Sequence, residues 1–216
     1  MKVRNLTIGL LGACAAAALA GASHASVLYD DGPLNGTIDA WTINFGYQVS
    51  DSFTLTKTST LTGVNFGVWS FPGDTFNTVD WSIGTAAYGS ASSGTGSVTN
   101  GAQTTNGFGY QIATDSFSLP NITLGPGTYF LTLQNAAVNT GDPIYWDQNN
   151  GPSQAFENSV GDLNQYPGGG AEAFQILGNT GAVPEPATWT IMLMGVGLLG
   201  GALRTSRKAQ AGAVAA

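Results

Sequence analysis

Apolar and polar residues alternate with a period of two in short segments between residues 26 and 178. Residues 79–83 place Val79, Trp81 and Ile83 on one face of an extended segment. The same pattern occurs in residues 52–56, 64–68, 117–119, 129–133 and 173–176. Turn signals rich in glycine and proline separate the segments, and no helical periodicity is sustained between them. The pattern predicts one all-β domain over residues 26–178, an antiparallel β-sandwich or jelly roll.

Two stretches interrupt this pattern. Residues 91–107 consist almost entirely of serine, threonine, glycine, asparagine and alanine, which predicts a long loop or a hairpin tip. Residues 179–183 predict a short linker between the domain and the C-terminal segment.

The charge of the central region restricts its partners. Between residues 26 and 183, Lys57 is the only basic residue and stands against twelve acidic ones, a net charge of −11. The electric field of so negative a surface repels nucleic acid and does not attract anionic lipid, so nucleic-acid binding is excluded.

The N-terminus has the organisation of a secretory signal peptide. Lys2 and Arg4 precede a largely apolar run over residues 6–20, and Ser23-His24-Ala25 fits the small-x-small cleavage pattern. We predict a signal peptide over residues 1–25, cleaved between Ala25 and Ser26; an N-terminal membrane anchor is the alternative.

Cleavage at this position limits the chemistry of the exported chain, because it removes Cys14 and His24, the only cysteine and the only histidine. A disulfide framework, a cysteine nucleophile, a histidine-based triad and a His/Cys zinc site are then excluded. We therefore expect no cofactor and no metal site of this kind.

The C-terminal region predicts a single membrane span. Residues 187–203 are uncharged and would extend about 25 Å as a helix, the short limit for a bilayer. Trp189 stands where an interfacial aromatic residue belongs, and the basic residues after the span indicate a cytoplasmic C-terminus, with residues 209–216 as the tail. These basic residues are Arg204, Arg207 and Lys208. A buried core helix is the alternative interpretation.

The motif before this span resembles a known sorting signal. Val183-Pro184-Glu185-Pro186, an aromatic residue, a short apolar span and a terminal basic cluster follow one another in order. This arrangement, over residues 183–208, resembles the PEP-CTERM sorting signal of Gram-negative bacteria that produce exopolysaccharide, and we assign the signal itself to residues 184–208. The resemblance implies an exosortase, a membrane protease or transpeptidase, as partner, with processing near residues 184–186. It also implies export across the inner membrane, a membrane-anchored precursor and delivery to the cell surface or extracellular matrix.

Carboxylates are the strongly reactive groups that the exported domain retains. A glycosidase needs two of them about 5 to 10 Å apart, and the candidates, with no pair favoured, are Asp80, Asp147, Glu157 and Glu172. Asp30, Asp31 and residues 142–147 could supply oxygen ligands to calcium, but no EF-hand spacing is present. Acidic residues scattered over a soluble surface are the ordinary explanation.

The aromatic residues suggest a different kind of site. Trp41, Trp69 and Trp81 lie in or beside polar segments, and Trp81 is predicted to be in the core because of its strict alternation with Val79 and Ile83. The adjacent Tyr145 and Trp146 must point to opposite sides of a strand, so one ring can face outward and stack on a glycan.

Together these features predict an exported, non-enzymatic surface or extracellular-matrix protein, sorted through its C-terminal signal and associated with exopolysaccharide. The alternatives are a carbohydrate-binding module and a glycoside-active enzyme that uses paired carboxylates.

Overall fold

The computed structural model describes residues 25–159, 166–167, 170–181 and 192–198. The predicted signal peptide, except Ala25, therefore lies outside the described residues. So do the sorting-signal residues Val183, Pro184, Glu185, Pro186, Trp189, Arg204, Arg207 and Lys208.

The described chain up to residue 181 is built from β-strands. In order these are β1 (Ser26–Asp30), β2 (Ala40–Thr42), β3 (Tyr47–Leu55), β4 (Ser59–Ser70), β5 (Phe76–Gly84), β6 (Ser92–Ser97), β7 (Thr104–Thr105), β8 (Gln111–Leu124), β9 (Gly127–Val138), β10 (Tyr145–Asn149), β11 (Ala155–Ser159), β12 (Tyr166–Pro167), β13 (Ala171–Glu172) and β14 (Phe174–Thr180).

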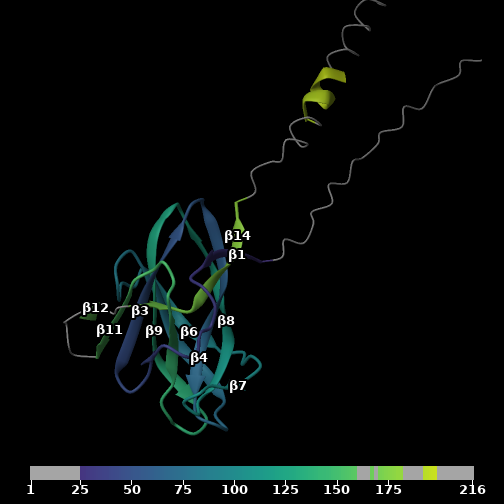
Figure 1. Cartoon of the computed structure of the whole chain (residues 1–216). Coiled ribbons are helices and arrows are strands. Elements are labelled where there is room, and N and C mark those ends of the chain that lie inside the picture. The colour runs from purple at the N-terminus through teal and green to yellow at the C-terminus, as the bar shows by residue number, and fades with distance from the viewer. Residues whose placement is uncertain (1–24, 160–165, 168–169, 182–191, 199–216) are drawn as a thin grey trace, which may run out of the picture.

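The strands form two antiparallel sheets (Figure 1). The eight-stranded sheet follows the order β1-β14-β4-β10-β13, with β8 on the other side of β4, β7 beside β8 and β2 beside β10. The six-stranded sheet follows the order β12-β11-β3-β9-β5-β6. The two sheets face each other across one core, where Phe53 of β3 meets Phe174 of β14 with ring centroids 6.5 Å apart. The predicted antiparallel all-β fold is confirmed, with the arrangement of a β-sandwich.

The alternation in the sequence places side chains as expected. Val79, Trp81 and Ile83 of β5 are buried in the core, as are Leu131 and Leu133 of β9. These residues belong to neighbouring strands of the six-stranded sheet and point toward the eight-stranded one. Each fully buried aliphatic side chain contributes about 1.5–3 kcal/mol of hydrophobic stabilisation.

The glycine- and serine-rich stretch over residues 91–107 differs from the prediction. It contains β6, which pairs with β5, and β7, which pairs with β8. A Cβ atom on Gly94 would lie 3.0 Å from the Trp81 ring, and one on Gly96 would lie 2.8 Å from the Phe117 ring. The stretch is therefore not one long loop: it holds the paired strand β6 (Ser92–Ser97), whose glycines make room for large neighbouring rings, and the short β7, joined by connecting residues.

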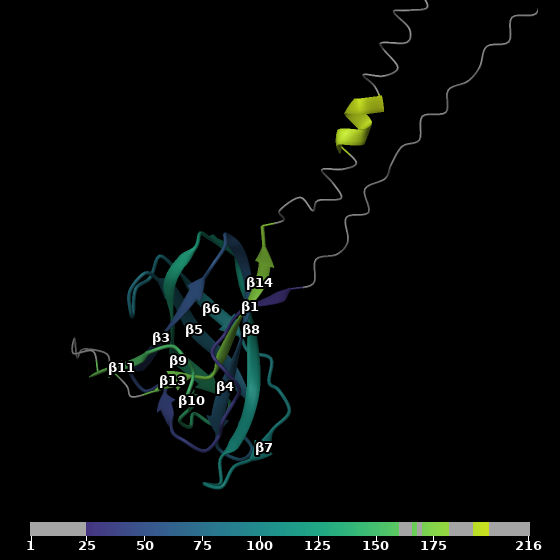
Figure 2. The ribbon, with the colours of Figure 1, turned by 45° about the horizontal axis from the view of Figure 1, so that its top comes forward.

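The two ends of the domain lie side by side (Figure 2). Ala25 is exposed, β1 begins at Ser26, and Ser26 pairs with Gly178 of β14. Strand β14 continues to Thr180, so the predicted linker begins two residues later than expected. The chain thus enters and leaves the sandwich at one end of the molecule.

Beyond the sandwich, residues 192–198 form a short helix. Within the described part of the chain, no helix is both long and apolar enough to cross a membrane. Most of the span predicted over residues 187–203 lies outside the described residues.

Candidate functional site

The two adjacent rings of β10 face opposite sides of the eight-stranded sheet. Trp146 has no exposed surface; its indole N–H donates to the carbonyl of Ala173 at 3.1 Å, and its ring packs edge-on against Phe66 and Phe174. Trp146 is thus a core residue and cannot stack on a glycan. Tyr145 is partly exposed and lies on the outer face.

Tyr145 lies in a cleft of about 410 Å³ on that outer face, a size typical of small-molecule sites. Its strand partner Trp69 also points outward, because Val68 beside it belongs to the core. The cleft is lined by Ile38, Asp39, Ala40, Trp69, Phe108, Tyr110 and Tyr145.

Aromatic rings pack against one another in and beside this cleft. The Tyr110 ring lies 5.6 Å from Trp69, 5.6 Å from Tyr145 and 5.1 Å from Phe71, measured between centroids. Phe108 stacks on Trp69 at 5.8 Å with an interplanar angle of 21°, and 64% of Phe108 is exposed. We refer to these five residues as the aromatic platform.

Two residues of the platform, Phe108 and Tyr110, lie in a turn that the side chain of Asn106 stabilises. The Asn106 side-chain carbonyl accepts hydrogen bonds from the backbone N–H groups of Phe108 and Tyr110, both at 3.0 Å. Its amide donates to the carbonyl of Gly36 at 3.1 Å, and Gly109 takes the positive φ of +87° that the turn requires. The exposure of Phe108 therefore belongs to an ordered turn.

Asp147 holds Trp69, the most buried ring of the platform, by a hydrogen bond. Its carboxylate accepts hydrogen bonds from the Trp69 indole N–H and from the backbone N–H groups of Asn35, at 2.6 Å, and Gly36, at 2.8 Å. Burial raises the pKa of Asp147 above its ordinary value, and these bonds oppose the rise. The role of Asp147 in this structure is to hold Trp69 and the loop before β2.

A second acidic group lies inside the sandwich, where Asp31 and Asp51 are both buried. The Ser153 hydroxyl lies 2.6 Å from Asp31 Oδ2 and 2.8 Å from Asp51 Oδ2. A serine hydroxyl has only one hydrogen to donate, so two short contacts with carboxyl oxygens need a second proton. Burial raises the pKa of Asp31 and raises that of Asp51 to about 7, so a carboxyl proton on one of the two can supply this second hydrogen bond below that pH.

Glu172 adjoins this pair. Its backbone N–H donates to Asp51 Oδ2 at 2.6 Å, and its side chain is fully buried. Burial, and then the charge of Asp51, raise the pKa of Glu172 well above its ordinary value. Among the described residues, no cluster of three histidine, cysteine, aspartate or glutamate side chains is arranged to hold a metal ion.

The four carboxylates considered for glycoside chemistry are placed differently from one another. Asp147 and Glu172 have no exposed surface. Asp80 is partly exposed and accepts hydrogen bonds from Thr95, at 2.6 Å, and Asn135, at 3.0 Å. Burial, and then the charge of nearby Asp39, raise the pKa of Glu157.

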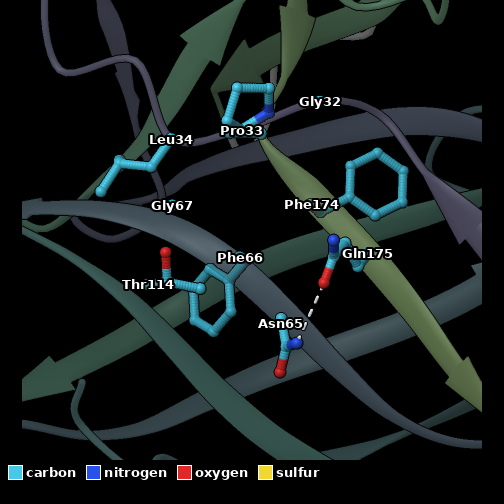
Figure 3. Close-up of a pocket in the computed structure, with 10 residues that line it drawn as sticks. Gly32, Pro33, Leu34, Asn65, Phe66, Gly67, Thr114, Phe174 and Gln175 are labelled. Carbon is cyan, nitrogen blue, oxygen red and sulfur yellow. Dashed lines mark hydrogen bonds between the residues drawn. The ribbon is translucent and has the colours of Figure 1, made fainter. Parts of the chain in front are cut away.

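Another cavity, of about 330 Å³, lies between residues 32–34 and the eight-stranded sheet (Figure 3). Pro33 and Leu34 lie on one side of it. On the other side, the Asn65 side-chain amide donates a hydrogen bond to the Gln175 side-chain carbonyl at 3.1 Å. Its lining contains no ionisable side chain, so the aromatic cleft is the stronger candidate site.

Sequence reasoning identified Tyr145 and considered Trp69, but missed Phe108 and Tyr110. The signal for these two rings is the Gly107-Phe108-Gly109-Tyr110 run, in which aromatic residues alternate with glycines in a turn.

The fold defines a β-sandwich protein, and the segment that follows its last strand is the part that matches a known family. Residues 182–208 match the family model of the PEP-CTERM protein-sorting motif. No curated protein matches the chain. The chain thus carries a PEP-CTERM motif, which marks an exported protein that an exosortase, a membrane protease, processes from a membrane-anchored precursor.

Proposed function

We propose that this protein is a non-enzymatic component of the cell surface or extracellular matrix, released by an exosortase and associated with exopolysaccharide. One observation carries the proposal: the PEP-CTERM motif begins at residue 182, directly after β14 ends at Thr180. A folded domain is therefore joined to its sorting motif with almost no intervening chain.

The short helix supports retention of the precursor in a membrane. Its large apolar side chains are between 63% and 75% exposed, without cover from the sandwich. Such side chains are stabilised in lipid. They are Met192, Leu193, Met194, Val196 and Leu198.

The paired ends of the domain support release without unfolding. Strand β14 is paired with β1 on one side as far as Gly178 and with β4 on the other as far as Thr180. Cleavage near residues 184–186 would fall beyond the last strand pair, so the sandwich would keep all its strand hydrogen bonds.

The aromatic platform favours carbohydrate binding as a second candidate function. It exposes rings at one edge of an open cleft on a rigid sheet, and aromatic faces of this kind pack against the apolar faces of sugar rings. Binding of this type would hold a released protein in the matrix.

The proposal is tested by replacing Pro184, Glu185 and Pro186 with alanine and fractionating the cells. We expect the wild-type domain to appear outside the cell, bound to exopolysaccharide, and the variant to stay full-length in the membrane fraction. Gly181→Ala, just upstream of the motif, is the control and should be released normally, since a Cβ there meets only the Thr58 carbonyl at 3.7 Å. Normal release of the triple variant, or a released domain that does not co-sediment with exopolysaccharide, would contradict the proposal.

A further inference from the structure

We propose that the aromatic cleft binds a sugar ring carrying a protonated amine, in preference to neutral and acidic sugars. The proposal rests on the glycan association proposed above and names the chemical class of the glycan.

The rings of the platform favour a cation. The face of an aromatic ring is electron-rich and attracts a cation that lies within about 6 Å of the centroid. Tyr110 is 5.6 Å from Trp69 and 5.6 Å from Tyr145, so one ammonium group beside Tyr110 can approach more than one ring. Partial exposure of Tyr110 and Tyr145 leaves ring surface open to the cleft.

The charges around the cleft also favour a positively charged ligand. Asp39 lines the cleft, is exposed, and is fixed by a hydrogen bond from the backbone N–H of Ala40 to its Oδ1 at 2.8 Å. Glu157 lies near enough for the charge of Asp39 to raise its pKa. The lining contains no lysine or arginine, and the domain carries a net charge of −11. This field attracts cations and repels carboxylate- or phosphate-bearing sugars.

The apolar part of the lining favours an organic ligand over a bare metal ion. Ile38 is 46% exposed and Phe108 is 64% exposed, and both lie at the cleft. A metal ion needs several oxygen ligands, whereas among the described residues Asp39 is the only carboxylate that lines the cleft. An amino sugar offers both a charge for Asp39 and an apolar ring face for Phe108.

The cleft is also organised before binding. Asp147 holds the Trp69 indole, and Asn106 holds the turn that carries Phe108 and Tyr110. A site whose rings are already fixed loses little conformational entropy when a ligand binds.

The test measures binding to the full chain, purified in a polyoxyethylene detergent that has no sugar headgroup. The probes are the tetramers of glucosamine, N-acetylglucosamine and galacturonic acid, titrated at pH 5.5 by isothermal calorimetry. The first two share the same sugar ring and differ at one position, where the acetylated tetramer carries a neutral acetamide in place of the charged amine. We expect the glucosamine tetramer to bind at least tenfold more tightly than the acetylated tetramer, and the acidic tetramer not to bind.

Substitutions test whether the preference for the amine arises in the cleft. Asp39→Asn should reduce the preference for the amine to less than threefold while the acetylated tetramer binds as before. Phe108→Ala should weaken both at least fivefold. The controls are Asp80→Asn, a partly exposed carboxylate on the other sheet, and Phe45→Ala, a ring equally exposed at 64% and not part of the cleft. Circular dichroism confirms that each variant is folded.

The outcomes separate the two proposals. Equal binding of the three tetramers, or a preference unchanged in Asp39→Asn, would overturn the amino-sugar proposal and leave carbohydrate binding in place. An equal loss in Asp80→Asn would overturn it as well, because it would show general attraction to an acidic protein. Absence of binding to every tetramer would overturn the amino-sugar proposal and remove carbohydrate binding as a function of the cleft, without affecting sorting.

Discussion

The buried carboxyl groups make the stability of the sandwich depend on pH in an unusual direction. Burial raises the pKa of Asp51 from 3.8 to about 7 and that of Asp115 to about 6. Between the ordinary and the raised pKa values, the native state holds protons that the unfolded chain releases. This stabilisation is fully present below pH about 4 and is lost as the pH rises to about 7, so raising the pH from 5 to 7.5 should destabilise the domain.

The size of the effect follows from the number of protons. Each proton bound only by the native state changes the free energy of unfolding by about 1.4 kcal/mol per pH unit. Asp51 alone, over about three pH units, accounts for up to about 4 kcal/mol. Asp115 adds to the slope below pH 6. We expect a decrease of at least about 1 kcal/mol per pH unit between pH 5 and 7.

Urea denaturation followed by tryptophan fluorescence at half-unit pH steps measures this slope. Repulsion among surface carboxylates has the same sign, so the series is repeated in 0.5 M NaCl, which screens exposed charges far more than buried ones. Asp51→Asn should flatten the slope between pH 6 and 7 by about one proton, whatever its stability, and Asp80→Asn should not. Stability that is constant or rises between pH 5 and 7 would refute the raised pKa values of Asp51 and Asp115.

Three further predictions follow from the sequence and the packing. Gly96→Ala should destabilise the domain by about 1–3 kcal/mol in urea, because its Cβ would lie 2.8 Å from the Phe117 ring, whereas Gly107→Ala, with open space around it, should change stability by less than about 0.5 kcal/mol. The thermal midpoint of the exported domain should be the same with and without reductant, because no cysteine follows Cys14; a shift would place signal cleavage upstream of that residue. Neutral replacements of the C-terminal basic cluster should invert or mix the orientation of the precursor in a protease-protection assay, and unchanged topology would count against their role; the residues are Arg204, Arg207 and Lys208.

The fold was predictable where side chains alternate strongly. Val79, Trp81 and Ile83 identify β5 because each second residue must face the core. Strand β6 was not predictable in this way, since its glycines and serines have no apolar pattern, and its place depends on the rings of Trp81 and Phe117 from other strands. Such pairing between distant segments is absent from any local window of sequence.

The candidate site was predictable only in part, for a similar reason. Adjacent positions in a strand showed that Tyr145 and Trp146 must diverge, but not which of them faces the core. The answer depends on Phe66 and Phe174, which surround Trp146 and come from other strands. The sorting motif, in contrast, is contiguous in sequence. The prediction of a PEP-CTERM motif needed no knowledge of the fold, and the family match over residues 182–208 confirms it.

We propose that an exosortase processes this chain at its PEP-CTERM motif and frees an intact sandwich. The most direct measurement is the C-terminal residue of the protein recovered from outside the cell, determined by intact-mass spectrometry of wild-type cultures and cultures lacking exosortase activity. We expect a mature chain that begins at Ser26 and ends within or just before residues 184–186, and that is absent without the exosortase. A secreted chain that retains residues 192–198, or the same mature C-terminus in cells without exosortase activity, would contradict the claim.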